Sequence, residues 1–198
     1  MPTTERKKAA KKKREPKIKT FLTEPEIEAF LQAAKKTRNG KRDHCLMLMV
    51  FRHGLRVSEA IDIRLSELDL SGCYINVRRL KGSRSGLQPI EGDEVRAIRS
   101  WMRDRVGFKM AGSDLLFLSE QGKFTRQTVN YLVKTIAKKA GFDFPVNPHM
   151  LRHTTGFILA NKNTATRTIQ ELLGHKNIGN TERYTAGNPE RMRGVWRK

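Results

Sequence analysis

Four short segments of the chain carry an arginine, a lysine or a histidine at the expected boundary of a helix or strand. They are HGLRVSEA at 53–60, RLKG at 79–82, PHMLRH at 148–153 and LLGH at 172–175, and the last is followed nine positions on by Tyr184. An arginine fork can bind two oxygens of a phosphate at once, and a tyrosine oxygen can act as a nucleophile. Together these segments predict a clamp for a phosphate with a phenol beside it.

Arg56 is a candidate for the centre of this clamp. It lies between a helix that we expect to end at Gly54 and a short helix that we expect Ser58 to cap. Backbone N–H groups at the start of a helix also attract anions. The guanidinium and the main chain could therefore bind the same phosphate.

The motifs of several common catalytic classes are missing. The sequence contains no GxxxxGK followed by Ser or Thr, no GxGxxG after an expected strand, no HExxH and no GxSxG, which disfavours nucleotide hydrolysis and zinc proteolysis. His149 and His153 have a spacing that could bind a metal. Arg152 lies between them and would oppose a divalent cation, so we expect no metal site.

The charge balance favours a polyanionic partner. The chain has 198 residues with 40 Lys+Arg against 20 Asp+Glu, a formal charge of +20, and nucleic acid is the foremost partner for so basic a protein. Residues 1–20 hold nine basic and two acidic residues, and the remainder still carries +13. The basic tail is either a solvated, disordered segment or an arm along phosphates, and the argument for nucleic acid stands without it.

No segment has the roughly 18–20 apolar residues of a membrane span, and charges occupy the N-terminus where a signal peptide would be apolar. We therefore expect a cytoplasmic protein with no membrane partner. Cys45 and Cys73 lie in apolar segments without metal-binding spacing, so we expect both in the core.

Hydrophobic periodicity predicts a mainly helical chain. The first helix begins at a capping box, Thr23 to Glu26, and carries an apolar stripe to Ala34. The segment 42–53 is apolar nearly all round and suits a buried helix. Further helical patterns lie at 58–61, 92–106, 125–140, 149–162, 165–173 and 180–185.

Between these helices the pattern alternates. Segments 68–70, 74–77 and 87–90 predict three short antiparallel strands, and 115–118 is ambiguous between a strand and a helix start. The expected fold class is mainly α with a small three-stranded antiparallel β-sheet (α+β). We expect one domain at 21–198 after a basic, disordered arm at 1–20.

In this order the segments resemble the catalytic domain of the tyrosine recombinase (phage integrase) family. The patterns G-L-R-x-S-E, H-x-L-R-H and L-G-H-x8-Y occur at Gly54–Glu59, His149–His153 and Leu173–Tyr184. The likeness covers roughly residues 21–190, and Lys81 falls where the family places a lysine on a β-hairpin. It implies the fold of the DNA breaking-rejoining catalytic domains.

The resemblance also implies a mechanism without metal, ATP or other cofactor. Tyr184 is expected to attack the scissile phosphate and form a 3′-phosphotyrosyl intermediate, while Arg56 and Arg152 bind the non-bridging oxygens. Lys81 is expected to protonate the leaving 5′-oxygen. The remaining expected roles are proton transfer at the tyrosine for His149 and a hydrogen bond to the phosphate for His175.

Two further residues of these motifs are expected to act indirectly. We expect Glu59 to orient an active-site cation and His153 to support the site rather than react. Tyr184 is the preferred nucleophile because Tyr74 is expected in a strand and Tyr131 in the core stripe of a helix. Lys81 depends on the alignment of one hairpin, since Arg79 and Arg84 flank it.

The layout departs from most of the family, because only about twenty basic residues precede the catalytic domain and no separate core-binding domain is expected. It resembles the short fimbrial phase-variation recombinases, also through 42–46 and the ending from Tyr184 to Trp196. This resemblance implies inversion of a promoter segment between inverted repeats in double-stranded DNA. It also implies a homo-oligomer, expected to be a tetramer on DNA in the nucleoid, with accessory DNA-bending proteins as possible partners.

Other functions remain open from the sequence. They are an integrase or transposon-type recombinase, a type IB topoisomerase-like enzyme that nicks and closes DNA without strand exchange, and a DNA-binding regulator that lacks catalysis. The fourteen residues after Tyr184 could dock on a neighbouring subunit or pack on their own domain.

Overall fold

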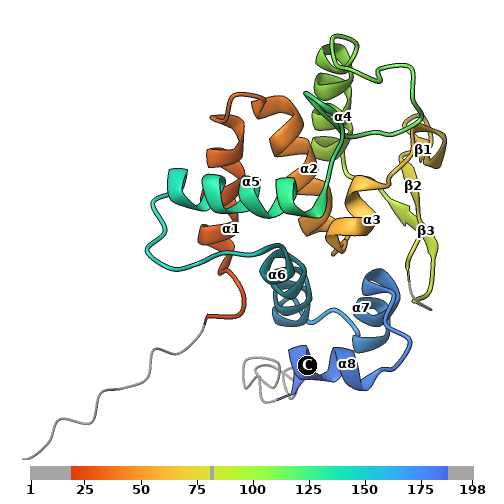
Figure 1. Cartoon of the computed structure of the whole chain (residues 1–198). Coiled ribbons are helices and arrows are strands. Elements are labelled where there is room, and N and C mark those ends of the chain that lie inside the picture. The colour runs from red at the N-terminus through yellow and green to blue at the C-terminus, as the bar shows by residue number, and fades with distance from the viewer. Residues whose placement is uncertain (1–18, 81–82, 187–198) are drawn as a thin grey trace, which may run out of the picture.

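A computed structural model describes residues 19–80 and 83–186 of the chain (Figure 1). The described part contains eight α-helices, one 3₁₀ helix and five short strands. The helices are α1 (Glu24–Lys35), α2 (Gly40–Arg52), α3 (Val57–Ile61), η1 (Leu65–Glu67), α4 (Gly92–Arg105), α5 (Arg126–Lys139), α6 (Pro148–Asn161), α7 (Thr166–Leu173) and α8 (Gly179–Thr185). The strands are β1 (Leu68–Asp69), β2 (Tyr74–Val77), β3 (Gly86–Pro89), β4 (Leu118–Ser119) and β5 (Gly122–Lys123).

This architecture confirms the predicted fold class. Strands β1, β2 and β3 form a three-stranded antiparallel sheet in that order, and helices make up most of the remaining structure. The ambiguous segment 115–118 is extended: Leu115 forms a bridge with Arg64, and Leu118 begins a small β4–β5 hairpin that the sequence pattern did not indicate.

The first two helices show how local sequence and core packing agree. At the start of α1 the Thr23 backbone N–H donates to Glu26 at 2.7 Å, as expected for the capping box. Helix α2 is buried from Cys45 to Val50, which confirms the expectation of a helix inside the core. It ends at His53, and Gly54 follows with a φ of +53°, a conformation that glycine adopts without strain.

Three expectations about individual residues are wrong. Helix α3 is capped by Arg56 rather than Ser58, because the Glu59 carboxylate accepts the Arg56 backbone N–H at 2.9 Å. Cys73 is exposed, since it lies in the tight turn before β2 with a φ of +59°. Tyr131 is 73% exposed, because the buried face of α5 is formed by the neighbouring aliphatic residues.

The buried apolar side chains form two clusters of unequal size. The main cluster joins α1, α2, α4, α5, the sheet and the inner face of α6. The C-terminal cluster is small and consists of Ala160, Ile169, Leu173 and Tyr184, with Phe157, Leu159 and Leu172 packed against it. Figure 1 shows α7 and α8 at one end of the molecule, next to α6. Among the residues that the structure describes, no helix is long and apolar enough to cross a membrane.

Candidate active site

Arg56 stands at the junction of α2 and α3 with its guanidinium partly open to solvent. Its Nη1 donates to Glu59 at 2.7 Å and to the Ser83 hydroxyl at 3.0 Å. The side chain remains 34% exposed. It is therefore held in place on one side while its remaining N–H groups stay available to a ligand.

Glu59 is the anion that orders this region. It is 4% exposed and contacts two guanidinium groups, those of Arg56 and Arg79, each at 2.7 Å. Burial alone would raise the pKa of Glu59, but Arg79 and the hydrogen bonds from Arg56 hold that pKa below its ordinary value. The carboxylate thus stays charged between Arg56 and Arg79, and its expected role in orienting an active-site cation stays a prediction.

Arg152 projects from α6 into the same space and is 5% exposed. Its Nη1 donates to the Gly54 carbonyl and its Nη2 to the Leu173 carbonyl, the latter at 2.7 Å. Burial is the main cause and repulsion from Arg79 and Arg56 the next, and together they lower the pKa of Arg152 to about 10. It remains cationic at neutral pH, and two main-chain oxygens fix its orientation.

His175 lies just after the end of α7. Gly174 has a φ of +68°, and a side chain there would meet the Arg84 carbonyl at 2.8 Å, so the turn requires glycine. The Nδ1 of His175 is 2.8 Å from the Thr181 hydroxyl. Burial has the largest effect on the pKa of His175 and the charge of Arg152 the next largest, and together they lower it to about 4. The imidazole is therefore neutral at pH 7.

Tyr184 is 1% exposed, and its ring packs edge-on against Phe157 with centroids 5.2 Å apart. Its hydroxyl is 2.9 Å from the Nδ1 of His153 and 3.2 Å from Arg183. The ring fills the space above Gly156, where an added Cβ would lie 2.8 Å from three ring carbons. The expected nucleophile is therefore packed against α6.

The structure brings the tyrosine hydroxyl to His153 and not to His149. Burial and the nearby Arg183 lower the pKa of His153 to about 4. The neutral ring can therefore accept a hydrogen bond from the Tyr184 hydroxyl. His149 is exposed in the first turn of α6. Its expected role in proton transfer stays a prediction.

Lys81 lies outside the described residues, as do most of the basic arm and the segment after residue 186. Described residues before and after this gap are tied to the site. The Leu80 backbone N–H points to Glu59 at 3.4 Å, and the Arg84 backbone N–H donates to the Gly174 carbonyl at 3.3 Å. Both ends of this hairpin loop therefore lie close to Arg79, one through Glu59 and the other through Gly174.

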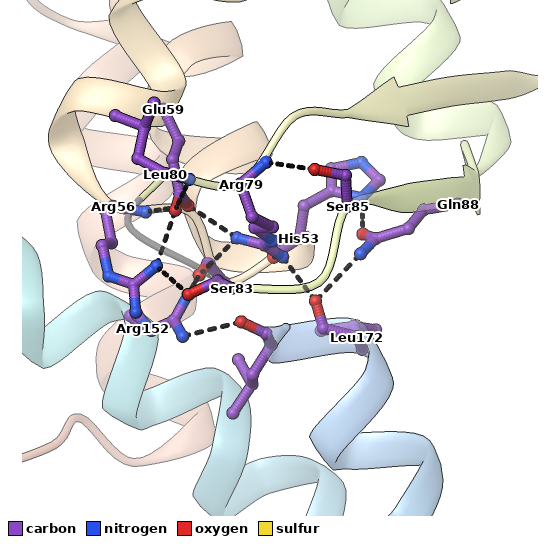
Figure 2. A network of polar contacts seen from close by, with 12 residues as sticks. His53, Arg56, Glu59, Arg79, Leu80, Ser83, Ser85, Gln88, Arg152 and Leu172 are labelled. Carbon is purple, nitrogen blue, oxygen red and sulfur yellow. Dashed lines mark hydrogen bonds and ion pairs between the residues drawn. The ribbon is translucent and has the colours of Figure 1, made fainter. Parts of the chain in front are cut away.

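Arg79, drawn in Figure 2, is a buried residue to which the sequence motifs assigned no role. The Arg79 side chain is 0% exposed, and it donates to Glu59 and to main-chain carbonyls of two separate helix ends. The sequence did carry a signal. Ile75, Val77 and Arg79 alternate along one face of β2 and its extension, and all three are buried, so this arginine belongs to the inward-facing set.

This arrangement can bind a phosphate between guanidinium and imidazole groups and place a phenol nearby. Within residues 19–80 and 83–186 no group of three or more His, Cys, Asp or Glu side chains is placed to hold a metal ion. The cations around the site come instead from arginine, and arginine forks suit the geometry and charge of a phosphate.

Comparisons with known proteins agree on one family. The model of the phage integrase family matches residues 20–191. The chain is 40% identical over 180 residues to the type 1 fimbriae regulatory protein FimE of Escherichia coli (strain K12), covering 90% of this chain and 91% of that protein. It is 41% identical over 187 residues to FimB of the same strain, covering 94% of each.

The fold resembles that of a solved recombinase. The crystal structure of XerA recombinase superposes with a TM-score of 0.79 at 28% identity, covering 94% of this chain and 66% of that one. The likeness thus extends over almost all of the present chain.

Proposed function

The chain belongs to the phage integrase family and is a tyrosine recombinase, and from this premise we propose that it inverts a DNA segment that controls fimbrial phase variation. The observation that carries the proposal is the 40–41% identity to FimE and FimB along nearly the full length of both. Those two proteins are described as regulators of type 1 fimbriae. A recombinase regulates transcription directly when the segment it inverts contains a promoter.

In the proposed reaction the Tyr184 oxygen attacks the phosphorus of the scissile phosphodiester. A bond forms between that oxygen and phosphorus, and the bond between phosphorus and the 5′-oxygen breaks, giving a 3′-phosphotyrosyl end and a free 5′-hydroxyl. The reverse attack by a 5′-hydroxyl of another strand rejoins the DNA. Because the phosphodiester energy is retained in the tyrosyl ester, the cycle consumes no ATP.

Arg56 and Arg152 bind the two non-bridging oxygens in this proposal. Charge builds on those oxygens in the transition state, and preorganised donors stabilise it more than the ground state. The fixed orientation of Arg152 between two carbonyls and of Arg56 between Glu59 and Ser83 supports this role. His175, which is neutral, donates a further hydrogen bond to the phosphate.

The proton balance requires one base and one acid. The hydroxyl proton of Tyr184 leaves to an imidazole, which is His149 in the predicted set, while the contact with His153 holds the hydroxyl before DNA binds. Lys81 protonates the departing 5′-oxygen. A neutral phenol is a weak nucleophile, so removal of its proton assists the attack.

Exposed cations on α5 support binding to double-stranded DNA near this site. Arg126, Lys134 and Lys138 are exposed on the outer face of the helix with Tyr131 between them. Cations along one face neutralise phosphates and release counterions. Cooperation of subunits on paired inverted repeats, as a tetramer with accessory DNA-bending proteins, completes the proposal for a cytoplasmic recombinase.

A covalent-trapping assay tests the chemistry. Wild-type protein and Tyr184→Phe are incubated with nicked inverted-repeat DNA from the chromosomal neighbourhood of the coding sequence, with EDTA present. We expect a complex that resists SDS only for the wild type. Binding of verified cognate DNA without such a complex would leave the chain a regulator and overturn the enzymatic proposal.

A plasmid assay tests the outcome of the reaction. A promoter segment flanked by the inverted repeats is placed on a supercoiled plasmid, and its orientation is followed by restriction digestion. Inversion supports the proposal. Relaxation of a plasmid that lacks the repeats indicates a topoisomerase-like enzyme, and excision between direct repeats with no inversion indicates an integrase-type recombinase.

A further inference from the structure

We propose that Arg79 is a positioning residue of the recombination reaction, whose buried guanidinium fixes the C-terminal cluster that carries the nucleophile to the arginines that bind the phosphate. The proposal rests on the proposed cleavage by Tyr184. It assigns to Arg79 no contact with DNA, since its side chain is 0% exposed.

The guanidinium of Arg79 joins segments that are distant in the sequence. Its Nη1 donates to Glu59 at 2.7 Å and to the Gly54 carbonyl at 3.3 Å. Its Nη2 donates to the His53 carbonyl at 2.7 Å and to the Leu172 carbonyl. One side chain therefore connects the end of α2, the start of α3 and the last turn of α7 (Figure 2).

Two of these acceptors are shared with other polar groups of the site. The Gly54 carbonyl also accepts from Arg152, and the Leu172 carbonyl also accepts from Gln88 at 2.9 Å. A shift of Arg79 would thus change the oxygen that orients Arg152. It would also release the end of α7, and this end directly precedes His175.

The charge of Arg79 matters as well as its hydrogen bonds. Glu59 is buried and holds Arg56. Its pKa stays below the ordinary value despite burial, and the charge of Arg79 is the largest of the effects that lower it. Without Arg79, burial would raise the pKa of Glu59. The carboxylate would then be neutralised more easily and would hold Arg56 less firmly.

The backbone of Arg79 extends this connection to the hairpin. Its N–H donates to the Ser85 hydroxyl at 2.9 Å, which closes the loop between β2 and β3 across six positions. The loop is also tied to Arg56 through Ser83 and to α7 through Arg84. Arg79 therefore lies where the hairpin, α3 and α7 meet, and lysine could not replace it because an ammonium group lacks the planar fork that reaches these acceptors.

Arg105 offers a matched control elsewhere in the fold. It is also buried, at 3% exposed, and it donates to the carbonyls of Ala111, Ser113, Leu115 and Leu116. These contacts fasten the loop after α4, and none of them involves Arg56, Arg152 or Tyr184. Replacement of either arginine by methionine removes a buried cation that donates to main-chain carbonyls, but only Arg79 also pairs with Glu59 and connects the site.

The experiment compares Arg79→Met, Arg79→Lys, Arg105→Met and wild type on the nicked inverted-repeat duplex. DNA affinity is measured by fluorescence anisotropy below the melting temperature of every variant, and the rate of adduct formation is measured in a single turnover with DNA saturated. We expect Arg105→Met to bind and cleave as the wild type does. We expect Arg79→Met to bind within about twofold but to cleave on the order of 100-fold more slowly, the size of effect that a small misplacement of reacting groups produces.

A pH profile separates positioning from loss of fold. Because the pKa of Glu59 rises when Arg79 is absent, the cleavage rate of Arg79→Met is expected to fall as the pH is lowered across a range where the wild-type rate is constant. Arg79→Lys keeps a cation beside Glu59. Its cleavage rate is expected to stay below that of the wild type but not to fall further as the pH is lowered across this range. A profile for Arg79→Met that is parallel to that of the wild type would contradict the proposed role.

Three other outcomes decide the matter. Cleavage by Arg79→Met at the wild-type rate would overturn this inference alone. Equal proportional losses of binding and cleavage would assign Arg79 a purely structural role and overturn it as well. Absence of an adduct with the wild type itself would overturn the proposed function, and this inference with it.

Discussion

The main apolar cluster and the C-terminal cluster differ in how strongly each is anchored and in which part of the site each carries. The main cluster includes Trp101, Phe30 and most of α2, and also the residues that directly precede Arg56 and Arg152 in the sequence. The C-terminal cluster has few buried apolar residues, and Tyr184 is one of them. Arg56 and Arg152, the proposed phosphate ligands, thus lie next to the larger apolar cluster, and Tyr184, the proposed nucleophile, belongs to the smaller one.

This difference indicates that the two halves of the site have different local stabilities. Segments with few apolar contacts open at lower free energy than the global unfolding of a domain. Polar contacts of Arg79, Gln88 and Arg152 with the end of α7 join the two clusters. Firmly packed arginines and a more loosely packed Tyr184 suit the proposed reaction, in which the DNA must enter before the tyrosine attacks.

The largest expected effect comes from breaking the main cluster. Trp101 is 1% exposed, and its Nε1 donates to the Leu116 carbonyl at 2.9 Å. Trp101→Ala is expected to lower the free energy of unfolding by about 3–5 kcal/mol, measured by urea denaturation followed by circular dichroism. If Leu173→Ala, in the C-terminal cluster, shifted the global transition equally, the two clusters would be one cooperative unit and the comparison would fail.

A smaller and local effect is expected from filling the space between Gly156 and the Tyr184 ring. In Gly156→Ala the new Cβ would lie 2.8 Å from the Tyr184 ring, and overpacking of this kind costs about 1–3 kcal/mol. We expect faster hydrogen exchange of α8 amides with little change in α2. Gly112→Ala is the control, since no atom lies within 4 Å of its added Cβ. Unchanged exchange in α8 would show that Tyr184 is not confined by α6.

Acid is expected to loosen the C-terminal cluster before the main one. His153 and His175 have pKa values lowered to about 4, chiefly by burial, against about 6.5 in the unfolded chain. Between these values the unfolded state binds more protons, so the stability that the neutral histidines contribute is complete above pH 6.5 and is lost as the pH falls toward 4. The charged groups facing the two rings are all cationic or can become so: Arg56, Arg79, His149, Arg152 and Arg183.

Hydrogen exchange at pH 7 and pH 5, corrected for intrinsic rates, checks this expectation. We expect α8 to lose roughly tenfold or more of its protection at pH 5 while α2 loses little. Glu59, with its lowered pKa, keeps its charge over most of this range. In a His153→Asn, His175→Asn double variant the acid sensitivity of α8 should disappear, and its persistence there would assign it to other groups.

The smallest expected effect on stability accompanies the largest effect on chemistry. Tyr184→Phe keeps the ring packed on Phe157 and Gly156 but removes the hydroxyl that contacts His153 and Arg183. We expect a loss of about 0.5–1.5 kcal/mol in local stability together with complete loss of the covalent adduct. Thermal unfolding and exchange of α8 measure the first, and gel analysis of trapped DNA the second. A global destabilisation as large as that of Trp101→Ala would again merge the two clusters.

Periodicity and capping patterns were sufficient to predict most of the elements. The eight helices and the three-stranded sheet follow from apolar spacing, turn residues and caps, all of which act over a few neighbouring residues. The wrong expectations for Cys73 and Tyr131 share one cause. Apolar character in a local window predicts burial only on average, and which face of an element meets the core is fixed by its partners.

The sequence by itself determined the types of residues in the site and their order along the chain. It indicated Arg56, Arg152, His175 and Tyr184 as neighbours through the motifs that carry them, and the structure places their segments together. Only the tertiary structure decided that His153 contacts the Tyr184 hydroxyl and that Arg79 connects α2, α3 and α7. These contacts join groups 31 and 93 positions apart, and a local pattern holds no information on such pairs because packing of whole helices brings them together.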